Sequence, residues 1–345
     1  MKIKNQILSF IAILTFALMT FSCTNDEPKE VTPLSSIVAI AKADPANFSI
    51  LVDALKKTGL EATLSNSGSY TVFAPTNAAF TAAGITSASV NALVAPADNA
   101  AIANLRLLLQ NHVITLGTRS NDLLAAGYSR TFAFYKSSPT STSGANLSLF
   151  VNQVGTDVLV NGGVVNGGAK VTKGDIEASN GIVHVVDGVI NLPSIVNQIK
   201  ANPNLSSLLS VVTSTAQTSV LTTLNAATGS APLTVYAPDN GAFTAANATS
   251  GYLVGKSSIQ VTNILRYHLE NGNKTASSAT SFTSSSATTD VSVTTLYTPN
   301  KFTILLGTVK IKDIVATSNG TIKTINIQGT NGVIQVIDKV LQPFL

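Results

Sequence analysis

The chain has 345 residues, of which 45% are hydrophobic and only 11% are charged, and its formal net charge is +4. No cluster of Lys and Arg alternates with aromatic residues, so the sequence lacks the basic face that phosphate neutralisation requires, and we expect no nucleic-acid partner. The low charge, the 23 glycines and the absence of Trp are typical of compact β-rich domains with many turns.

The first residues are typical of an export signal. Lys2 and Lys4 precede an uncharged, largely apolar run over residues 6–22, which is too short and wrongly flanked for a permanent membrane-spanning helix. We therefore expect residues 1–22 to be a lipoprotein signal peptide that is removed. Its two lysines leave with it, which lowers the formal net charge from +4 to +2.

The only cysteine, Cys23, directly follows this run, and an unpaired thiol in an exported protein needs an explanation. The sequence Thr20-Phe21-Ser22-Cys23 resembles the lipobox of bacterial lipoproteins, in which the thiol carries a diacylglycerol. Thr20 departs from the aliphatic residue that is usual at its position. Because hydrophobic Met19 and Phe21 flank Thr20 and Ser22 fits the small residue before the cysteine, we expect lipidation of Cys23 rather than a free or buried thiol. Several acyl chains on one residue would give durable membrane anchoring.

Residues 23–33 form a polar stretch that cannot pack, which predicts a short tether behind the lipidated cysteine. Its acidic residues Asp26, Glu27 and Glu30 resemble the surface-export signals of some Gram-negative lipoproteins, and they are equally compatible with a plain solvated linker. Both interpretations predict a location in the cell envelope. We expect a lipid anchor in the outer membrane, with exposure at the cell surface left open.

The rest of the chain is a tandem repeat. Residues 71–80, TVFAPTNAAF, return as residues 234–243, TVYAPDNGAF, and residues 180–190 return as residues 331–341. The order of these landmarks is kept while the lengths between them change, which is typical of two homologous domains rather than of a short-period solenoid. Each copy has about 150 residues, enough to bury its own core. The predicted domains are residues 34–192 and 193–345.

Each repeat is predicted to begin with a helix. Asp44 before Pro45 supplies a capping carboxylate and a proline in the first turn, and apolar residues follow at helical spacing until Gly59. In the second repeat Asn202 and Pro203 hold the corresponding places.

The first duplicated segment predicts a strand-to-helix corner. Residues 70–74 form a short strand that Pro75 must end, because proline offers no donor to the sheet. The chain then turns into a helix that carries Phe80 inward. A further helix is predicted from about residue 98 to residue 112.

The remainder of the first repeat is predicted to be β structure. Asn-Gly and Gly-Gly turns separate short apolar segments, which indicates an α+β domain with a largely antiparallel sheet. Two Ser/Thr-rich stretches, residues 137–143 and 275–289, are expected to be exposed variable loops. The predicted strands are residues 131–135, 147–151, 158–160, 164–165, 169–171 and 182–189.

Each repeat contains, in the same order, the first duplicated segment, a histidine (His112 or His268) and the second duplicated segment. In this order of motifs both repeats resemble fasciclin (FAS1) domains. The resemblance implies a β-wedge of about seven strands packed by helices, a role in cell adhesion or surface protein contacts, and no catalytic activity. It covers nearly everything after the tether. The residues that match the family motifs, for which we expect structural roles, are Pro75, Thr76, Phe80, His112, Asn180, Gly181 and Asp187 in the first repeat and Pro238, Phe243, His268, Asn331, Gly332 and Asp338 in the second.

One pair of residues is a candidate for binding. The second duplicated segment, residues 180–190 and 331–341, is called the second box below. Animal fasciclin domains use an Asp-Ile pair just before this box in receptor binding, and Asp175-Ile176 matches that place. The second repeat has Asn326-Ile327 instead. Because the acidic group is not kept between the repeats, we interpret Asp175 as a turn residue rather than as a ligand.

The sequence predicts no enzyme. His112 and His268 lie at helical spacing from leucines, valine and isoleucine, so we expect them to be buried, hydrogen-bonded core residues rather than bases or metal ligands. Nucleophile elbows, phosphate loops and zinc-type cysteine sets are absent from the sequence, and we expect no cofactor and no metal. A hydrolase that uses scattered residues such as His112 and Asp122 is the least favoured alternative.

The leading hypothesis is therefore an envelope lipoprotein that acts in adhesion. Its expected partners are cell-surface or matrix proteins, glycans, or further copies of itself, and it contacts the membrane through its lipid anchor. The second hypothesis is a glycan-binding accessory of an outer-membrane nutrient-uptake system, motivated by polar loops such as residues 128–143.

Overall fold

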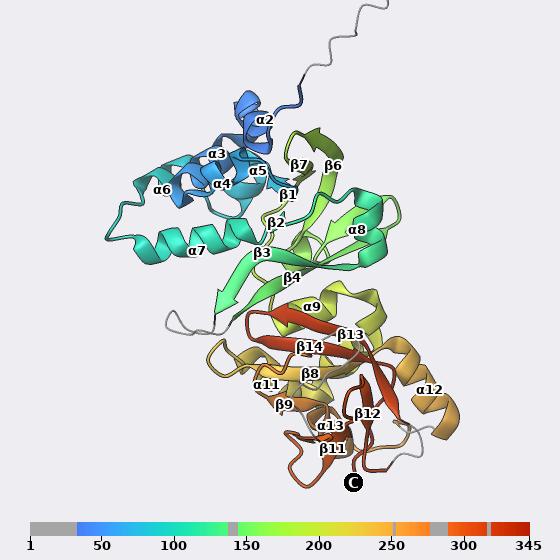
Figure 1. Ribbon diagram of the computed structural model, residues 1–345. Coiled ribbons are helices and arrows are strands. Elements are labelled where there is room, and N and C mark those ends of the chain that lie inside the picture. The colour runs from blue at the N-terminus through green and yellow to red at the C-terminus, as the bar shows by residue number, and fades with distance from the viewer. Residues whose placement is uncertain (1–32, 137–143, 251–252, 277–288, 316–318) are drawn as a thin grey trace, which may run out of the picture. The chain divides into compact units, whose positions relative to one another are not determined.

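The computed structural model describes residues 33–136, 144–250, 253–276, 289–315 and 319–345. The chain divides into residues 1–34 and one compact unit, residues 35–345, which holds both repeats (Figure 1). The expectations for the signal peptide, for Cys23, for residues 137–143 and for most of the loop at 275–289 fall outside the described residues. Among the helices that are described, none is long and apolar enough to cross a membrane.

The first repeat opens with helices packed against one another. The prediction for the longest of them is confirmed, because Asp44 caps it through the backbone N–H of Asn47 (3.3 Å), Pro45 begins it and Gly59 ends it with φ 72°. Four short helices, α2, α4, α6 and α8, were not expected. The helices are α2 (Ile37–Ala43), α3 (Pro45–Thr58), α4 (Leu60–Ser65), α5 (Asn77–Ala82), α6 (Ser87–Ala92), α7 (Asn99–Gln110) and α8 (Ser120–Ala126).

The seven strands of the first repeat close into a barrel in chain order. The first and last strands pair in parallel and close it, whereas every other pair of neighbouring strands is antiparallel. The expected fold class, α+β with a largely antiparallel sheet, is confirmed. The strands are β1 (Tyr70–Pro75), β2 (Val113–Ile114), β3 (Tyr128–Lys136), β4 (Gly144–Val154), β5 (Asp157–Val160), β6 (Ala169–Ala178) and β7 (Gly181–Val186).

One predicted strand of the first repeat is wrong. Val164 and Val165 lie in a short 3-10 helix, η1 (Val164–Asn166), and not in a strand. The reason is the backbone on either side, where Gly163 and Gly167 adopt φ values of 79° and 74° that turn the chain.

The second repeat follows the same plan. Its seven strands are ordered β10-β11-β12-β13-β14-β8-β9, and β14 pairs in parallel with β8 as β7 does with β1. Its helical segments are α9 (Ile195–Ala201), η2 (Pro203–Leu205), α10 (Ser206–Val212), η3 (Thr215–Gln217), α11 (Thr218–Ala226), α12 (Asn240–Ser250) and α13 (Ser258–Tyr267). Its strands are β8 (Leu233–Pro238), β9 (Leu269–Asn271), β10 (Val291–Thr294), β11 (Lys301–Ile304), β12 (Lys310–Lys312), β13 (Gly320–Gly329) and β14 (Gly332–Ile337).

The central parallel strand divides each repeat into two cores. In β1, Val72 and Ala74 pack against the helices, whereas Phe73 points to the other side and joins the barrel interior. In β8, Ala237 belongs to the helical core and Tyr236 to the second core. Because side chains alternate along a strand, one six-residue strand serves both cores.

Side chains of the two repeats also bond to each other within this compact unit. The amide of Gln198 on α9 is fully buried and donates to the backbone oxygen of Ser148 on β4 (2.6 Å). The Ser148 hydroxyl accepts from the backbone N–H of Gln328 on β13 (2.9 Å). Tyr128 of the first repeat packs against the helical core of the second and accepts from the side chain of Asn202 (3.3 Å). Specific hydrogen bonds therefore join the repeats, while the buried Oε1 atom of Gln198 has no hydrogen-bond partner.

Candidate functional site

The two motif histidines are locked into the core by both ring nitrogens. The Nδ1 atom of His112 lies 2.8 Å from the carbonyl oxygen of Leu108, and its Nε2 atom accepts from the backbone N–H of Ile190 (2.8 Å). His268 repeats this geometry with Ile264 (2.8 Å) and Leu341 (2.9 Å). Each ring therefore carries its proton on Nδ1 and joins the end of one helix to the chain that follows the last strand.

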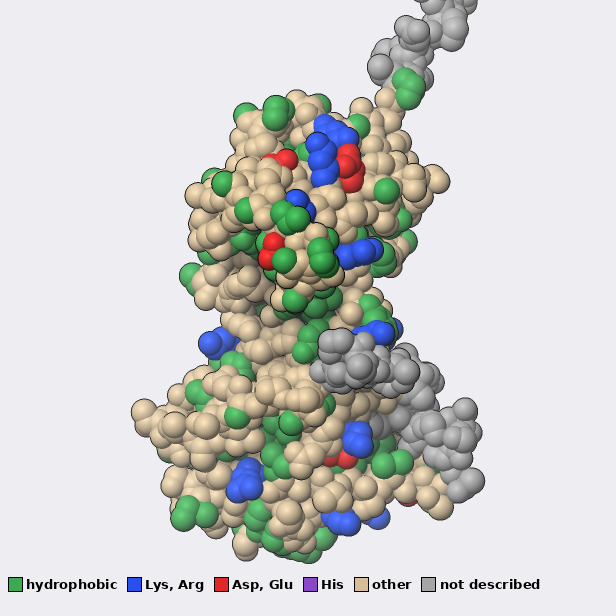
Figure 2. Space-filling view, turned by 90° about the vertical axis from the view of Figure 1, so that its left-hand side faces the viewer, with side chains coloured by type: hydrophobic (Ala, Val, Ile, Leu, Met, Phe, Trp, Pro, Cys, Tyr) green, Lys and Arg blue, Asp and Glu red, His purple; other side chains and the backbone are tan. Residues whose placement is uncertain are grey.

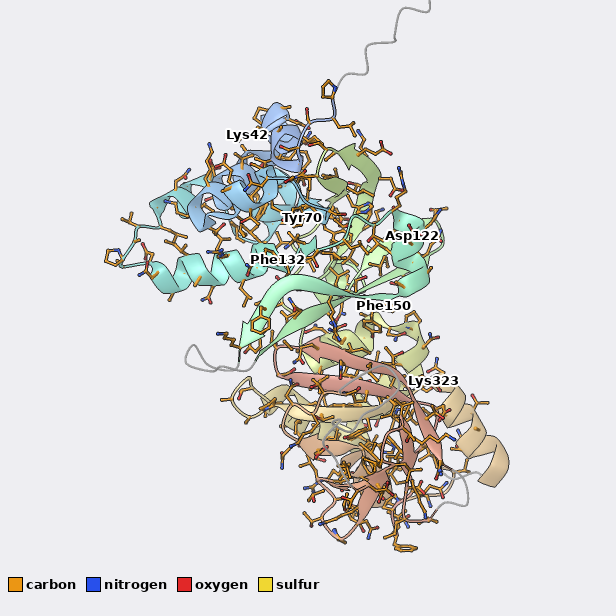
Figure 3. All side chains as sticks on the ribbon, viewed as in Figure 1. Lys42, Tyr70, Asp122, Phe132, Phe150 and Lys323 are labelled. Carbon is orange, nitrogen blue, oxygen red and sulfur yellow. The ribbon has the colours of Figure 1, made fainter. Side chains whose placement is uncertain are left out.

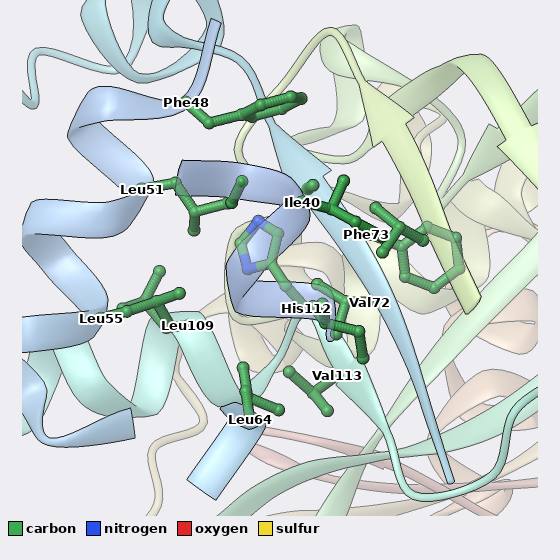
Figure 4. Close-up of a pocket in the computed structure, with 14 residues that line it drawn as sticks. Ile40, Phe48, Leu51, Leu55, Leu64, Val72, Phe73, Leu109, His112 and Val113 are labelled. Atoms are coloured by element: carbon green, nitrogen blue, oxygen red, sulfur yellow. The ribbon is translucent and has the colours of Figure 1, made fainter. Parts of the chain in front are cut away.

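Burial sets the charge of these rings. His112 and His268 are almost fully buried, and burial lowers the pKa of each to about 4, although the backbone hydrogen bond at Nδ1 opposes the shift. Figure 4 shows the His112 ring among apolar side chains such as Leu51, Leu55 and Leu109. With both nitrogens engaged and the ring neutral, these histidines serve as connectors within the fold.

The second box begins with an asparagine that holds the first helix of its repeat. In the first repeat the Asn180 side chain accepts from the backbone N–H of Ile37 (2.9 Å) and donates to the carbonyl oxygen of Leu64 (2.7 Å). In the second, Asn331 accepts from Ile195 (2.8 Å) and donates to Leu224 (3.1 Å). Both side chains are buried, so these bonds replace lost contacts with water.

The glycine that follows each asparagine is required by space. Gly181 pairs with Tyr70 and Gly332 with Leu233 in the parallel ladders. A Cβ atom added at either glycine would lie 1.9 Å from the carbonyl oxygen of its partner, a distance that two non-bonded atoms cannot adopt. Their φ values, 151° and 146°, are also ones that other residues rarely adopt.

The remaining box residues cap and close neighbouring segments. Thr76 caps α5 through the N–H of Ala79 (3.2 Å), and Phe80 is fully buried. Asp187 and Asp338 accept from backbone N–H groups at the edges of β6 and β13, namely Lys170 (2.7 Å) and Thr321 (2.6 Å). In the second repeat Pro238 ends β8 and Phe243 is buried.

Asp175 lies at a bulge in β6 and bonds within its own repeat. Its φ is 56°, and its Oδ1 atom accepts from the backbone N–H of Ser120 (2.8 Å). Asn326 occupies the same place in the second repeat, with φ 58° and an Oδ1 atom that accepts from Ala276 (2.7 Å). Ile176 is half-buried against the helical core. Asp and Asn are therefore equivalent at this position, because both tolerate a left-handed backbone and both offer an oxygen.

We expect Asp175→Asn to leave stability unchanged within about 0.5 kcal/mol, whereas Asp175→Ala should cost about 1–2 kcal/mol, because alanine loses the hydrogen bond and strains the left-handed backbone. Urea unfolding of the full chain measures both values. Partner binding by Asp175→Asn is the second readout. A loss of binding with unchanged unfolding would show that the carboxylate itself is a ligand.

His184 and Gln335 occupy equivalent places in the two repeats and make equivalent hydrogen bonds. The Nδ1 atom of His184 accepts from the backbone N–H of Asp175 (3.2 Å), and its Nε2 atom lies 3.2 Å from the oxygen of Thr118. Gln335 accepts from Asn326 (2.9 Å) and donates to Lys274 (2.9 Å). A glutamine amide reproduces one acceptor and one donor of an imidazole.

The structure does not bring together the residues of the hydrolase alternative. Both nitrogens of His112 are bonded to the backbone, while Asp122 lies exposed on α8 (Figure 3). In the described part of the chain, groups of three or more His, Cys, Asp or Glu side chains that could hold a metal ion are absent. On the face drawn in Figure 2, the Lys and Arg side chains are scattered rather than gathered into a stripe.

The geometry defines a class of protein: two homologous α+β modules whose repeated motif residues bond to one another inside each module. A family model for the fasciclin domain matches residues 46–193 and 203–343. The chain belongs to the fasciclin family. Its domains are of a non-catalytic type whose general roles are cell adhesion and protein interaction.

The chain is also similar to individual proteins. The chain is 29% identical over 204 residues to Protein sll1483 of Synechocystis sp., covering 56% of this chain and 99% of the relative. It is 30% identical over 165 residues to the transforming growth factor-beta-induced protein ig-h3 of Sus scrofa, covering 47% of this chain and 20% of that protein. Among solved structures, a FAS1 domain pair from the insect cell adhesion molecule fasciclin I matches with a TM-score of 0.48 and 16% identity, covering 89% of this chain and 96% of that one.

Proposed function

We propose that this chain is a lipoprotein of the cell envelope, anchored through Cys23, whose two fasciclin domains make adhesive contacts with cell-surface or matrix proteins, with glycans or with other copies of the chain. One observation carries the proposal. In both repeats the motif residues are engaged inside the domain, which leaves the exposed loops and outer faces as the groups that can meet a partner. The lipobox resemblance at residues 20–23 supports the anchor.

The anchor is tested by fractionation. In its own cells the full chain should be found in the membrane fraction, and Cys23→Ser, which removes the acyl acceptor, should move it to the soluble fraction. Protease treatment of intact cells then tests the orientation, because only a surface-exposed chain is digested. A Cys23→Ser variant that stays in the membrane fraction would rule out the lipid anchor.

The adhesive role is tested by binding. Purified full-length protein should bind cells, matrix proteins or itself in a saturable way at micromolar concentrations, about −8 kcal/mol of binding free energy. Chain unfolded by low pH and kept unfolded is the matched control, because it holds the same residues without the domain surfaces. If folded and unfolded chains bound equally, the contacts would not belong to fasciclin surfaces.

A further inference from the structure

The β3–β4 hairpin of the first repeat runs toward the second repeat (Figure 1). Residues of both repeats line a polar cleft there. Its volume is about 430 Å3, which falls within the range of small-ligand sites. One wall is the end of the hairpin, where Tyr135 pairs with Ala145. The other walls come from the loop before β8, from the segment after β9 and from the turn between β13 and β14. The side chains named below are among those that line it, and none of the described residues in its lining is charged.

The aromatic ring of Tyr135 in this cleft packs directly against the backbone of Gly229. A Cβ atom added at Gly229 would lie 2.4 Å from the hydroxyl oxygen of Tyr135 and 3.2 Å from carbon atoms of its ring. Only glycine therefore allows the ring to lie where it does. Tyr135 is half-buried, so part of its surface remains open to the cleft.

The amides of the cleft are held in place. Gln328 is buried, and its side chain donates to the backbone oxygens of Gly329 (2.8 Å) and Gly332 (3.0 Å). Its amide also forms a two-way pair with the exposed amide of Asn273, with distances of 3.0 Å and 3.2 Å. This pair uses one N–H and one oxygen lone pair of Asn273. In the described part of the chain, the second N–H and the second lone pair of that amide stay available to a ligand.

The chemistry of the lining selects a class of ligand. Anions require Lys, Arg or a cluster of donors, and hard cations require carboxylates, neither of which lines the cleft. Ser230, Thr275 and Thr330 add hydroxyl groups that both donate and accept. A neutral sugar has a C–H face that packs on an aromatic ring and hydroxyl groups that match amides and hydroxyls. We propose that this cleft binds a short neutral oligosaccharide.

Calorimetric titration of the full-length protein with cellotriose, maltotriose, xylotriose, mannotriose and chitotriose tests the site. At least one of these should bind in a saturable way with a Kd below about 1 mM. Tyr135→Ala and Asn273→Ala should each weaken binding at least about tenfold, the loss of one good contact. Phe134→Ala is the matched control. Phe134 is the neighbour of Tyr135 on β3, is 48% exposed and projects from the opposite face of the strand, so this variant should bind as the natural chain does.

Thermal unfolding of each variant must match that of the natural chain, so that a loss of binding reports on the cleft. The absence of saturable binding to all five sugars would overturn the assignment, and so would binding that survives either cleft substitution or is lost in Phe134→Ala. The assignment rests on the proposed contact function of the chain. If the natural chain binds its adhesive partners but none of the sugars, the sugar site in the cleft is overturned and the proposed function stands. If the folded natural chain shows no adhesive binding, the proposed function is overturned.

Discussion

Acidification from pH 7 to pH 5 is expected to lower the free energy of unfolding by about 2 kcal/mol for each of His112 and His268, because their folded pKa of about 4 lies well below the unfolded value of about 6.5. Between these two values the unfolded chain binds more protons than the folded chain. The stabilisation is therefore complete above pH 6.5 and is lost as the pH falls through the folded pKa. Protonation of Nε2 would also remove the acceptor for Ile190 and for Leu341.

Urea unfolding at pH 7, 6 and 5 measures this effect. His112→Gln and His268→Gln should each lower the free energy of unfolding at pH 7. Each should also reduce the slope of this free energy against pH, by an amount that corresponds to at most one proton taken up on unfolding. His184→Gln is the matched control, because the second repeat already uses glutamine at that place, and stability at pH 7 should stay within about 1 kcal/mol. Burial also lowers the pKa of His184, so this variant should remove the acid sensitivity of that residue. An unchanged pH slope in the double variant of His112 and His268 would contradict the assignment.

Gly181→Ala and Gly332→Ala are expected to destabilise their domains by more than about 3 kcal/mol each, near the upper end of what single substitutions do. The new methyl group would lie 1.9 Å from a backbone oxygen of the neighbouring parallel strand. Backbone that is paired in a ladder cannot move aside as a flexible side chain can. The pairing of β7 with β1, or of β14 with β8, must therefore open at its first residue pair.

Gly155→Ala is the matched control for this prediction. Gly155 also has a positive φ, 61°, but an added Cβ atom there meets nothing within 4 Å. It should cost only about 1–2 kcal/mol, the strain of a left-handed backbone. Denaturant midpoints of the three variants give the comparison. Equal losses at Gly155 and Gly181 would mean that backbone conformation, and not the close approach of the strands, makes the box glycines necessary.

The sequence predicted those parts of the fold that short-range chemistry determines. Asp44 and Pro45 begin a helix, and Pro75 ends a strand. Both effects can be predicted from the sequence because helix capping and the missing proline N–H act within a few residues. The resemblance between the repeats then supplied the family and the fold class. The expected burial of His112 and His268 followed from helical spacing, and their exposed fractions are 2% and 3%.

Other features depend on contacts between distant segments. The bulges at Asp175 and Asn326 need a partner segment 55 and 50 residues away along the chain to hold a left-handed non-glycine residue, and no local pattern indicates them. The cleft beside Tyr135 is assembled from several separate segments. Val164 and Val165 favoured a strand by composition, yet the glycines around them determined the backbone.

The way Asn180 holds the first helix has a mechanical consequence. The segment that enters the first domain is bonded at Ser35 and Ile37 to the turn just before β7, through Ser179 (2.9 Å) and Asn180 (2.9 Å). The chain leaves this domain directly after β7. If the protein is pulled between its two ends, tension passes from the incoming segment into β7 and out again, and it stretches the strand along its own direction. The load enters at the bonds of Ser35 and Ile37 and leaves past the bond between Ile190 and His112, so these hydrogen bonds hold the two ends of the β7 segment in the domain.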